Sequence, residues 1–189
     1  SWLIILLTVI LFAPISAQAA LIYSEPRQFD VKLNQKFEVK FFLDTQDEDI
    51  NALEGILNFP QDLIDLVEVR DGSSIVNFWI QRPRVDGSPV KFSGIIPGGY
   101  RFPKGLVAAF IFESKAEGSG VISVENAQVL LNDGRGTPTQ LGLGFSSFEV
   151  TGSPKMPAWP VSELQDNEAP EPFLPALARD PATFDGKWF

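Results

Sequence analysis

The stretch Lys36-Phe37-Glu38-Val39-Lys40-Phe41-Phe42-Leu43-Asp44 alternates between apolar and polar residues over most of its length. Its odd-numbered positions are all apolar, and its even-numbered positions are charged as far as Lys40. Because successive side chains of a strand point to opposite faces, a period of two places the apolar set on one side. The pattern predicts a strand with one face in a hydrophobic core and the other in water.

The same pattern continues on both sides of this stretch. Gln28–Leu33 alternates before the turn Asn34-Gln35, and Leu53–Phe59 alternates until Pro60 ends the run. Further strands are predicted over Leu66–Arg70, Ile75–Gln81, Pro89–Ile96, Leu106–Glu113, Gly120–Glu125, Gln128–Leu131 and Phe145–Val150. Leu106–Phe112 contains no polar residue, which favours a central strand. The fold class predicted is an all-β sandwich of about nine antiparallel strands.

The chain begins with an apolar run, Trp2–Ile15, followed by the small-residue triplet Ala17-Gln18-Ala19. The run is short for a transmembrane helix, and the triplet suits signal peptidase. Residues 1–19 are therefore interpreted as a signal peptide without its basic start, with cleavage near Ala19. A retained signal-anchor is the alternative. Either way the predicted location is secreted or at the cell surface.

The composition of the chain narrows the possible chemistry. Net charge is −9, and there is no Cys and no His. An acidic chain repels phosphate backbones, so nucleic acid is not expected as a partner. Contact with a membrane is expected only through an uncleaved leader or an anchor beyond this chain. Thiol and imidazole catalysis are excluded, and Glu54 has no identifiable second carboxylate for glycoside hydrolysis, so no enzyme is predicted.

Composition changes at Thr151, where the predicted sandwich of residues 20–151 ends. Residues 152–185 contain seven prolines among acidic and small residues, which favours an extended linker, with disorder as the alternative. The last residues, Gly186-Lys187-Trp188-Phe189, are interpreted as the possible start of a further module.

Two polar loops could bind calcium. Asp44 and Asp47 belong to a run rich in carboxylates, and Asn132 and Asp133 precede a glycine. Calcium prefers such hard oxygen ligands, and one loop could complete the coordination of the other. The alternative for both is an ordinary solvated turn, because Asn-Asp-Gly adopts tight turns without a ligand. No other cofactor is predicted.

Three aromatic residues could form a sugar-binding surface. Tyr100 and Phe102 follow Pro97-Gly98-Gly99 and are expected in an exposed loop, and Trp79 lies in a predicted strand. A flat aromatic ring covers the apolar face of a pyranose. Core packing is the alternative for Trp79.

Several of these stretches together resemble cohesin domains. The resemblance rests first on Phe37–Thr45, Ile50–Pro60 and Leu63–Val69, and then on Leu106–Phe112, Gly118-Ser119-Gly120 and Ala127–Gly134. It covers roughly Leu21–Val150. It implies a nine-stranded jelly-roll sandwich related to cellulose-binding modules, with a flat face that binds dockerin modules in extracellular polysaccharide-degrading assemblies. No individual site residue is transferred.

The sequence thus predicts a non-catalytic binding module within a larger surface protein. Its expected partner is a protein, dockerin-like, or a polysaccharide outside the cell. One alternative is a carbohydrate-binding module that uses the aromatic residues above. Another is a structural spacer of a cell-surface protein.

Overall fold

The computed structural model describes residues 20–85 and 89–152, and over these ranges the chain is all-β. The predicted leader, the segment from residue 153 onward and the possible further module lie outside the described residues. No helix long and apolar enough to cross a membrane occurs within the described ranges.

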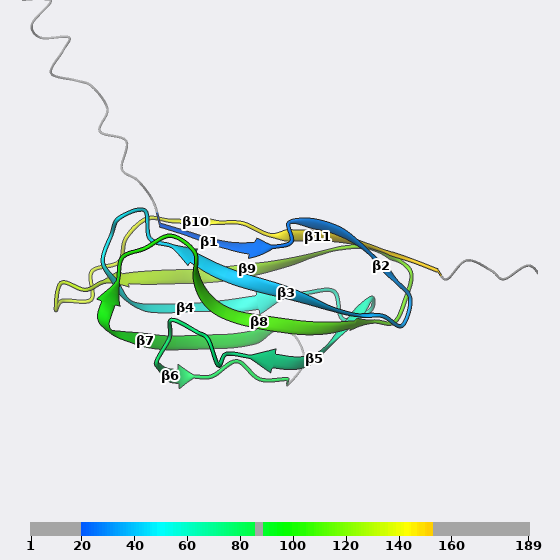
Figure 1. The fold of residues 1–189 in the computed structure, drawn as a ribbon, viewed down its shortest axis with the longest axis horizontal. Helices are drawn as coiled ribbons and strands as arrows, with labels where there is room; N and C mark the ends of the chain where they lie inside the picture. Colours follow the sequence, from blue (N-terminus) through cyan, green and yellow to red (C-terminus); the bar gives the residue numbers. More distant parts are fainter. Residues whose placement is uncertain (1–19, 86–88, 153–189) are drawn as a thin grey trace, which may run out of the picture. The chain divides into compact units, whose positions relative to one another are not determined.

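Eleven strands form two sheets in this part of the chain (Figure 1). The first sheet has the order β10-β1-β3-β8-β5 and the second the order β2-β11-β9-β4-β7-β6. The strands are β1 Ala20–Glu25, β2 Gln28–Lys32, β3 Lys36–Asp44, β4 Ile50–Asn58, β5 Ile64–Arg70, β6 Phe78–Gln81, β7 Val90–Tyr100, β8 Gly105–Ser114, β9 Gly118–Leu131, β10 Leu141–Leu143 and β11 Ser146–Thr151. The predicted all-β sandwich is confirmed.

Details of the strands differ from the prediction. β1 and β10 were not expected, and the two pair in parallel, as do β2 and β11. The two strands expected within residues 120–131 form a single strand, β9. Asn126 lies between them at φ 48°, where the pairing of β9 with β4 shifts register. Since the first strands of the chain lie beside its last strands, the sheets are mixed rather than purely antiparallel.

The chain crosses from the first sheet to the second at Pro26, between β1 and β2. Beside this crossing the buried hydroxyl of Ser146 donates to the Pro26 carbonyl at 2.6 Å and lies 2.8 Å from the Ser24 hydroxyl. These bonds satisfy polar groups that would otherwise be costly to bury. They join the start of the domain to β11.

Aromatic rings fill the core between the sheets. Phe112 on β8 is fully buried, and its ring lies 5.6 Å from Phe37 and 5.1 Å from Phe59. Phe41 and Phe110 meet edge to face at 5.8 Å. β8 lies between β3 and β5, as its apolar sequence predicted. In a chain without cysteine, this packing is the main source of stability.

Truncating a central ring tests this packing. Phe112→Ala should lower the free energy of unfolding by about 3–5 kcal/mol, because it removes buried surface and leaves a cavity. Phe102→Ala is the matched control, because that ring is 65% exposed and its loss should cost about 1 kcal/mol or less. Urea denaturation measures both. Equal losses would contradict the described core.

Candidate functional site

The outer face of the first sheet is covered by paired charges. Three rows of opposed residues cross β3, β8 and β5: Lys40–Ala109–Arg70, Glu38–Ile111–Glu68 and Lys36–Glu113–Asp65. Glu38 lies 3.0 Å from Lys40 and 3.6 Å from Arg70. Arg70 also bonds Glu68 at 2.7 Å, and this bond lowers the pKa of the Glu68 carboxyl. Charges on this face are largely compensated by their neighbours.

The outer face of the second sheet has a different character. Rows of opposed residues cross β9, β4, β7 and β6: Leu130–Ala52–Ile95–Phe78, Gln128–Glu54–Ser93–Gln81 and Glu125–Ile56–Lys91. The first row is entirely apolar, and the second has a single charged residue, Glu54. Phe78 is 61% exposed. We call this surface the β4 face, since β4 lies between β9 and β7 (Figure 1).

Shallow hollows mark the β4 face. One of about 220 Å³ lies over β4 and β7 and includes Glu54, Ile56 and Ser93 in its lining. Another, of about 450 Å³, lies at the end of the face beside Asn58 and Val121. The face therefore has shallow recesses that a partner's side chains could enter, and neither of these two hollows is a deep, enclosed site.

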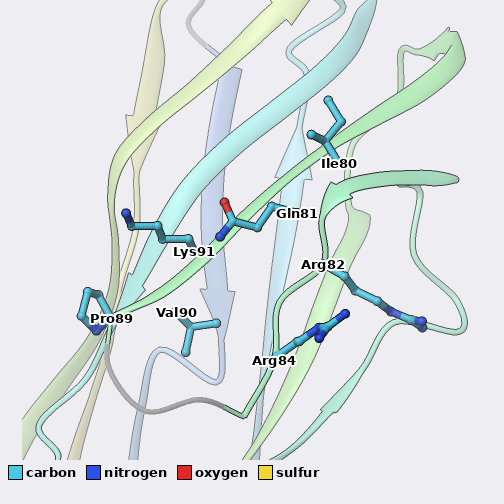
Figure 2. Close-up of a pocket in the computed structure, with 7 residues that line it drawn as sticks. All are labelled: Ile80, Gln81, Arg82, Arg84, Pro89, Val90 and Lys91. Atoms are coloured by element: carbon cyan, nitrogen blue, oxygen red, sulfur yellow. The ribbon is translucent and has the colours of Figure 1, made fainter.

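A third hollow, of about 410 Å³, lies at the β6 end of this sheet (Figure 2). Arg82 in its wall forms a bidentate pair with Asp71, with both bonds at 2.6 Å. This pairing, with help from a Trp79 hydrogen bond, lowers the pKa of the Asp71 carboxyl, and it raises the pKa of Arg82. The Asp71 side chain is only 9% exposed, so Arg82 is tethered to a fixed anion.

The three predicted sugar-binding residues do not form one flat surface. Trp79 is half-buried against the core, which agrees with the core-packing alternative. Tyr100 is the last residue of β7 rather than part of a loop, because Gly98 and Gly99, both at positive φ, let the strand bulge and resume. Its ring meets that of the exposed Phe102 at 66°, and its hydroxyl donates to the Pro103 carbonyl. Phe102 alone presents a largely free ring.

The two predicted calcium loops meet, but through a residue outside the predicted set. Asn132 donates from its side chain to Asp49 at 3.0 Å and from its backbone to the Asp49 carbonyl at 2.8 Å. Asp44 accepts the Gln46 amide at 3.0 Å, and Asp47 is exposed in the turn. Asp133 accepts from Thr137 and from the Arg135 amide, which lower its pKa. The described residues contain no group of three or more acidic side chains suited to a metal.

The residues of the β4 face were not identified from the sequence. The available signal was the alternation within Leu53–Phe59, which turns Glu54 and Asn58 away from the core. Their neighbours on the face come from β7 and β9, tens of residues further along the chain. Only the register of the sheet brings them together.

The two sheets and their strand order define a cohesin-like β-sandwich, and the resemblance inferred from the sequence is confirmed at the level of the fold. In particular, a non-cellulosomal cohesin from the archaeon Archaeoglobus fulgidus superposes with a TM-score of 0.58 at 14% identity, over 71% of this chain and 92% of that one. A cohesin module from a Clostridium perfringens family 33 glycoside hydrolase gives 0.55 at 14%, over 71% and 97%. The cohesin of a type I cohesin–dockerin complex from Clostridium thermocellum gives 0.55 at 14%, over 74% and 99%. No protein-family model and no curated protein sequence matches the chain.

Releasing Arg82 from its anion tests the tether at the third hollow. Asp71→Asn should lower the free energy of unfolding by about 1–2 kcal/mol at neutral pH, because a hydrogen-bonded charge pair is lost. The pKa of Asp71 is lowered in the folded state, so its contribution is lost as the pH falls below the ordinary value of 3.8. The difference in the free energy of unfolding between the wild type and Asp71→Asn, measured by urea denaturation, should therefore become smaller below this pH.

Asp65→Asn is the control for this measurement. Asp65 also forms a 2.6 Å ion pair, with Lys115, but its side chain is 58% exposed. Its loss should cost less than about 1 kcal/mol. A larger loss for Asp65→Asn than for Asp71→Asn would contradict the assignment of Asp71 as the fixed partner of Arg82.

Melting experiments decide between calcium binding at Asp44, Asp47, Asn132 and Asp133 and its alternative, ordinary solvated turns. A cation held only by the folded state raises the melting temperature. Because Asp44 and Asp133 already accept hydrogen bonds from their own turns, we expect calcium and chelator to give the same melting temperature. A rise with calcium that Asp133→Asn abolishes would instead establish the site.

Proposed function

We propose that the chain is a non-catalytic binding module that docks another protein on the β4 face. The observation that carries the proposal is the apolar row Leu130–Ala52–Ile95–Phe78, which crosses four strands in register on an outer surface. On the opposite outer face, each of the three rows across β3, β8 and β5 carries two or more charges. A shorter apolar row, Tyr23–Phe42–Leu106, lies near β1, where Lys104 lies over the Phe42 ring.

The physical basis is the cost of removing water from each face. Protein interfaces are depleted of charge at their centre, where a partner must displace water from both surfaces. On the first sheet, docking would desolvate Glu38, Arg70 and their ion-pair partners. On the β4 face it would cover alkyl groups and hydrogen-bonding side chains such as Ser93 and Gln128, and the three rows there carry three charges, against seven in the three charged rows of the first sheet. Covering the β4 face therefore requires less free energy of desolvation than covering the outer face of the first sheet.

The size of the face suits an elongated partner surface. Four strands at about 4.8 Å spacing make the apolar row about 14 Å long. A helix with its side chains is about 10–12 Å across, so one or two helices would cover the row. Several of the similar solved structures are cohesins in complexes with dockerins, which supports a dockerin-like protein as the partner class.

The proposed setting is extracellular or at the cell surface, within a larger protein. Support comes from the apolar leader with its Ala17-Gln18-Ala19 triplet. The Pro-rich residues 152–185 would act as a linker to further modules. Lack of histidine and cysteine supports the non-catalytic assignment.

A carbohydrate partner is the second candidate, and the exposed ring of Phe102 is the observation in its favour. Its test is binding to a panel of soluble and insoluble polysaccharides, with Phe102→Ala as the variant. The spacer hypothesis predicts binding to neither proteins nor polysaccharides.

The decisive experiment uses matched arginine substitutions on the two outer faces. Ile95 on the β4 face and Val67 on the first sheet are both β-branched, partly exposed and outward-facing. Against a panel of dockerin modules, measured by calorimetry, Ile95→Arg should weaken the tightest complex by at least about tenfold, or about 1.4 kcal/mol. Val67→Arg should leave that affinity unchanged.

Two results would reject the proposal. One is a complex that survives Ile95→Arg but is lost with Val67→Arg, which would move the interface to the first sheet. The other is the absence of any protein complex together with polysaccharide binding that Phe102→Ala removes. Melting temperatures of both arginine variants verify that each is folded.

A further inference from the structure

The hollow at the β6 end of the second sheet is cationic. Its lining consists of Ile80, Gln81, Arg82, Arg84, Pro89, Val90 and Lys91. Three of these residues are cations and none is acidic, in a chain whose net charge is −9. The hollow also adjoins the β4 face, because Gln81 and Lys91 line both this hollow and the hollow of about 220 Å³ over β4 and β7.

The three cations are not equivalent. Arg82 is compensated by its bidentate pair with Asp71. Arg84 and Lys91 are exposed, and neither forms an ion pair with any described residue. Elsewhere in the described residues, Lys36, Lys40, Arg70, Lys104 and Lys115 have acidic partners, whereas Arg27, Lys32, Arg101 and Arg135 form no ion pair but do not line this hollow. Positive charge at this hollow is therefore available to a ligand.

The cations line the hollow from two elements, and the charged ends of the arginines and of Lys91 point away from one another (Figure 2). Arg82 and Arg84 extend the same way from the segment that follows β6, whereas Lys91 extends the opposite way from β7, with Gln81 between them. The arginines and Lys91 have only N–H donors, and Gln81 adds the N–H donors of its amide group. A carboxylate has the acceptors that this donor set requires.

We propose that this hollow receives a carboxylate side chain of the protein that docks on the β4 face. Arg84 and Lys91, exposed on the two sides of the hollow, are its binding residues and would turn their charged ends toward the carboxylate, while Arg82 is held in place by Asp71. The inference rests on the proposed function and adds the chemistry of the partner, an acidic residue flanked by apolar ones. Ile80, 67% exposed at this hollow, and Phe78 on the adjoining row would contact the apolar flanks.

An acidic polysaccharide fits the surface less well than an acidic residue of a protein. A polyuronate carries a charge on every sugar and needs a track of cations. Next to the hollow, the β4 face instead carries Glu54 and Glu125, which would repel further negative charge. Among the described residues of the β4 face and the adjoining hollow, the cations Arg82, Arg84 and Lys91 gather at the hollow, beside an apolar row, and this favours an isolated acidic side chain.

The test is an NMR titration of the whole chain with short acetylated peptides. One peptide has a single glutamate flanked by leucines, and its matched probe has glutamine in its place. We expect the glutamate peptide to shift the amide signals of Gln81, Arg84 and Lys91, and the shifts to weaken with added salt. The glutamine peptide should shift them at least about tenfold more weakly at equal concentration.

Substitutions assign the effect to the hollow. The double variant Arg84→Gln/Lys91→Gln should reduce the affinity for the glutamate peptide by at least about tenfold. Arg101→Gln is the matched control, because Arg101 is exposed and has no ion pair within the described residues, and it should leave the affinity unchanged. Unchanged melting temperatures would show that the variants are folded.

Four results would overturn the inference: no shift with either peptide, equal shifts with both, equal loss with Arg101→Gln, or shifts produced only by oligogalacturonate. The outcome is separable from that of the proposed function. A dockerin complex lost with Ile95→Arg but unaffected by the double variant overturns this inference alone. Peptide binding without any protein complex on the β4 face overturns the proposed function, and with it the assignment of the carboxylate to a docking partner.

Discussion

Packing of phenylalanine rings between the two sheets is the constraint on which the other features depend. Phe37, Phe41, Phe110 and Phe112 all point inward from β3 and β8. Because side chains alternate along a strand, a slip of one residue would turn these rings into water and bring charged residues into the core. Burial of the rings therefore fixes the pairing of the strands, and the pairing fixes which residues meet on the outer faces. Both the charged rows and the β4 face are consequences of the core.

Much of the fold could be predicted because alternation is a local signal. Lys36–Asp44 and Leu53–Phe59 alternate clearly; the first is β3, and the second lies within β4 as far as Asn58. β1 and β10 were not predicted, because β10 has three residues and both strands pair in parallel with segments far away in the chain. Pro97-Gly98-Gly99 indicated a loop, yet in the structure the two glycines form a bulge within β7, since Tyr100 pairs again with Ile50 of β4. Local propensity cannot distinguish these outcomes, which depend on the neighbouring strand.

The candidate site was less predictable than the fold for the same reason. The alternation within Leu53–Phe59 turns Glu54 outward, but its neighbours Ser93 and Gln128 are brought to it only by the register of β4 with β7 and β9. The contrast between the faces is also a property of register. The alternation in the sequence already turns Lys40 outward. Only the folded sheet shows that Glu38 balances the charge of Lys40 and also pairs with Arg70. Single strands thus indicate which residues face water, and paired strands determine what kind of surface they make.

Arg84 and Lys91 lie near β6, at the edge of the second sheet, and their charge affects which partner can bind at this edge. β6 is the last strand of the second sheet, and Phe78 and Ile80 leave apolar surface exposed on it. Such an edge can pair with the same edge of a second copy, which leads to aggregation. Here that pairing would bring Arg84 and Lys91 of one copy toward the same cations of the other, and the bulge between Trp79 and Gln81 also interrupts a regular edge. Like charges oppose self-association, whereas a partner with an acidic side chain among apolar ones meets complementary charge. The same side chains therefore disfavour a second copy and favour a heterologous protein.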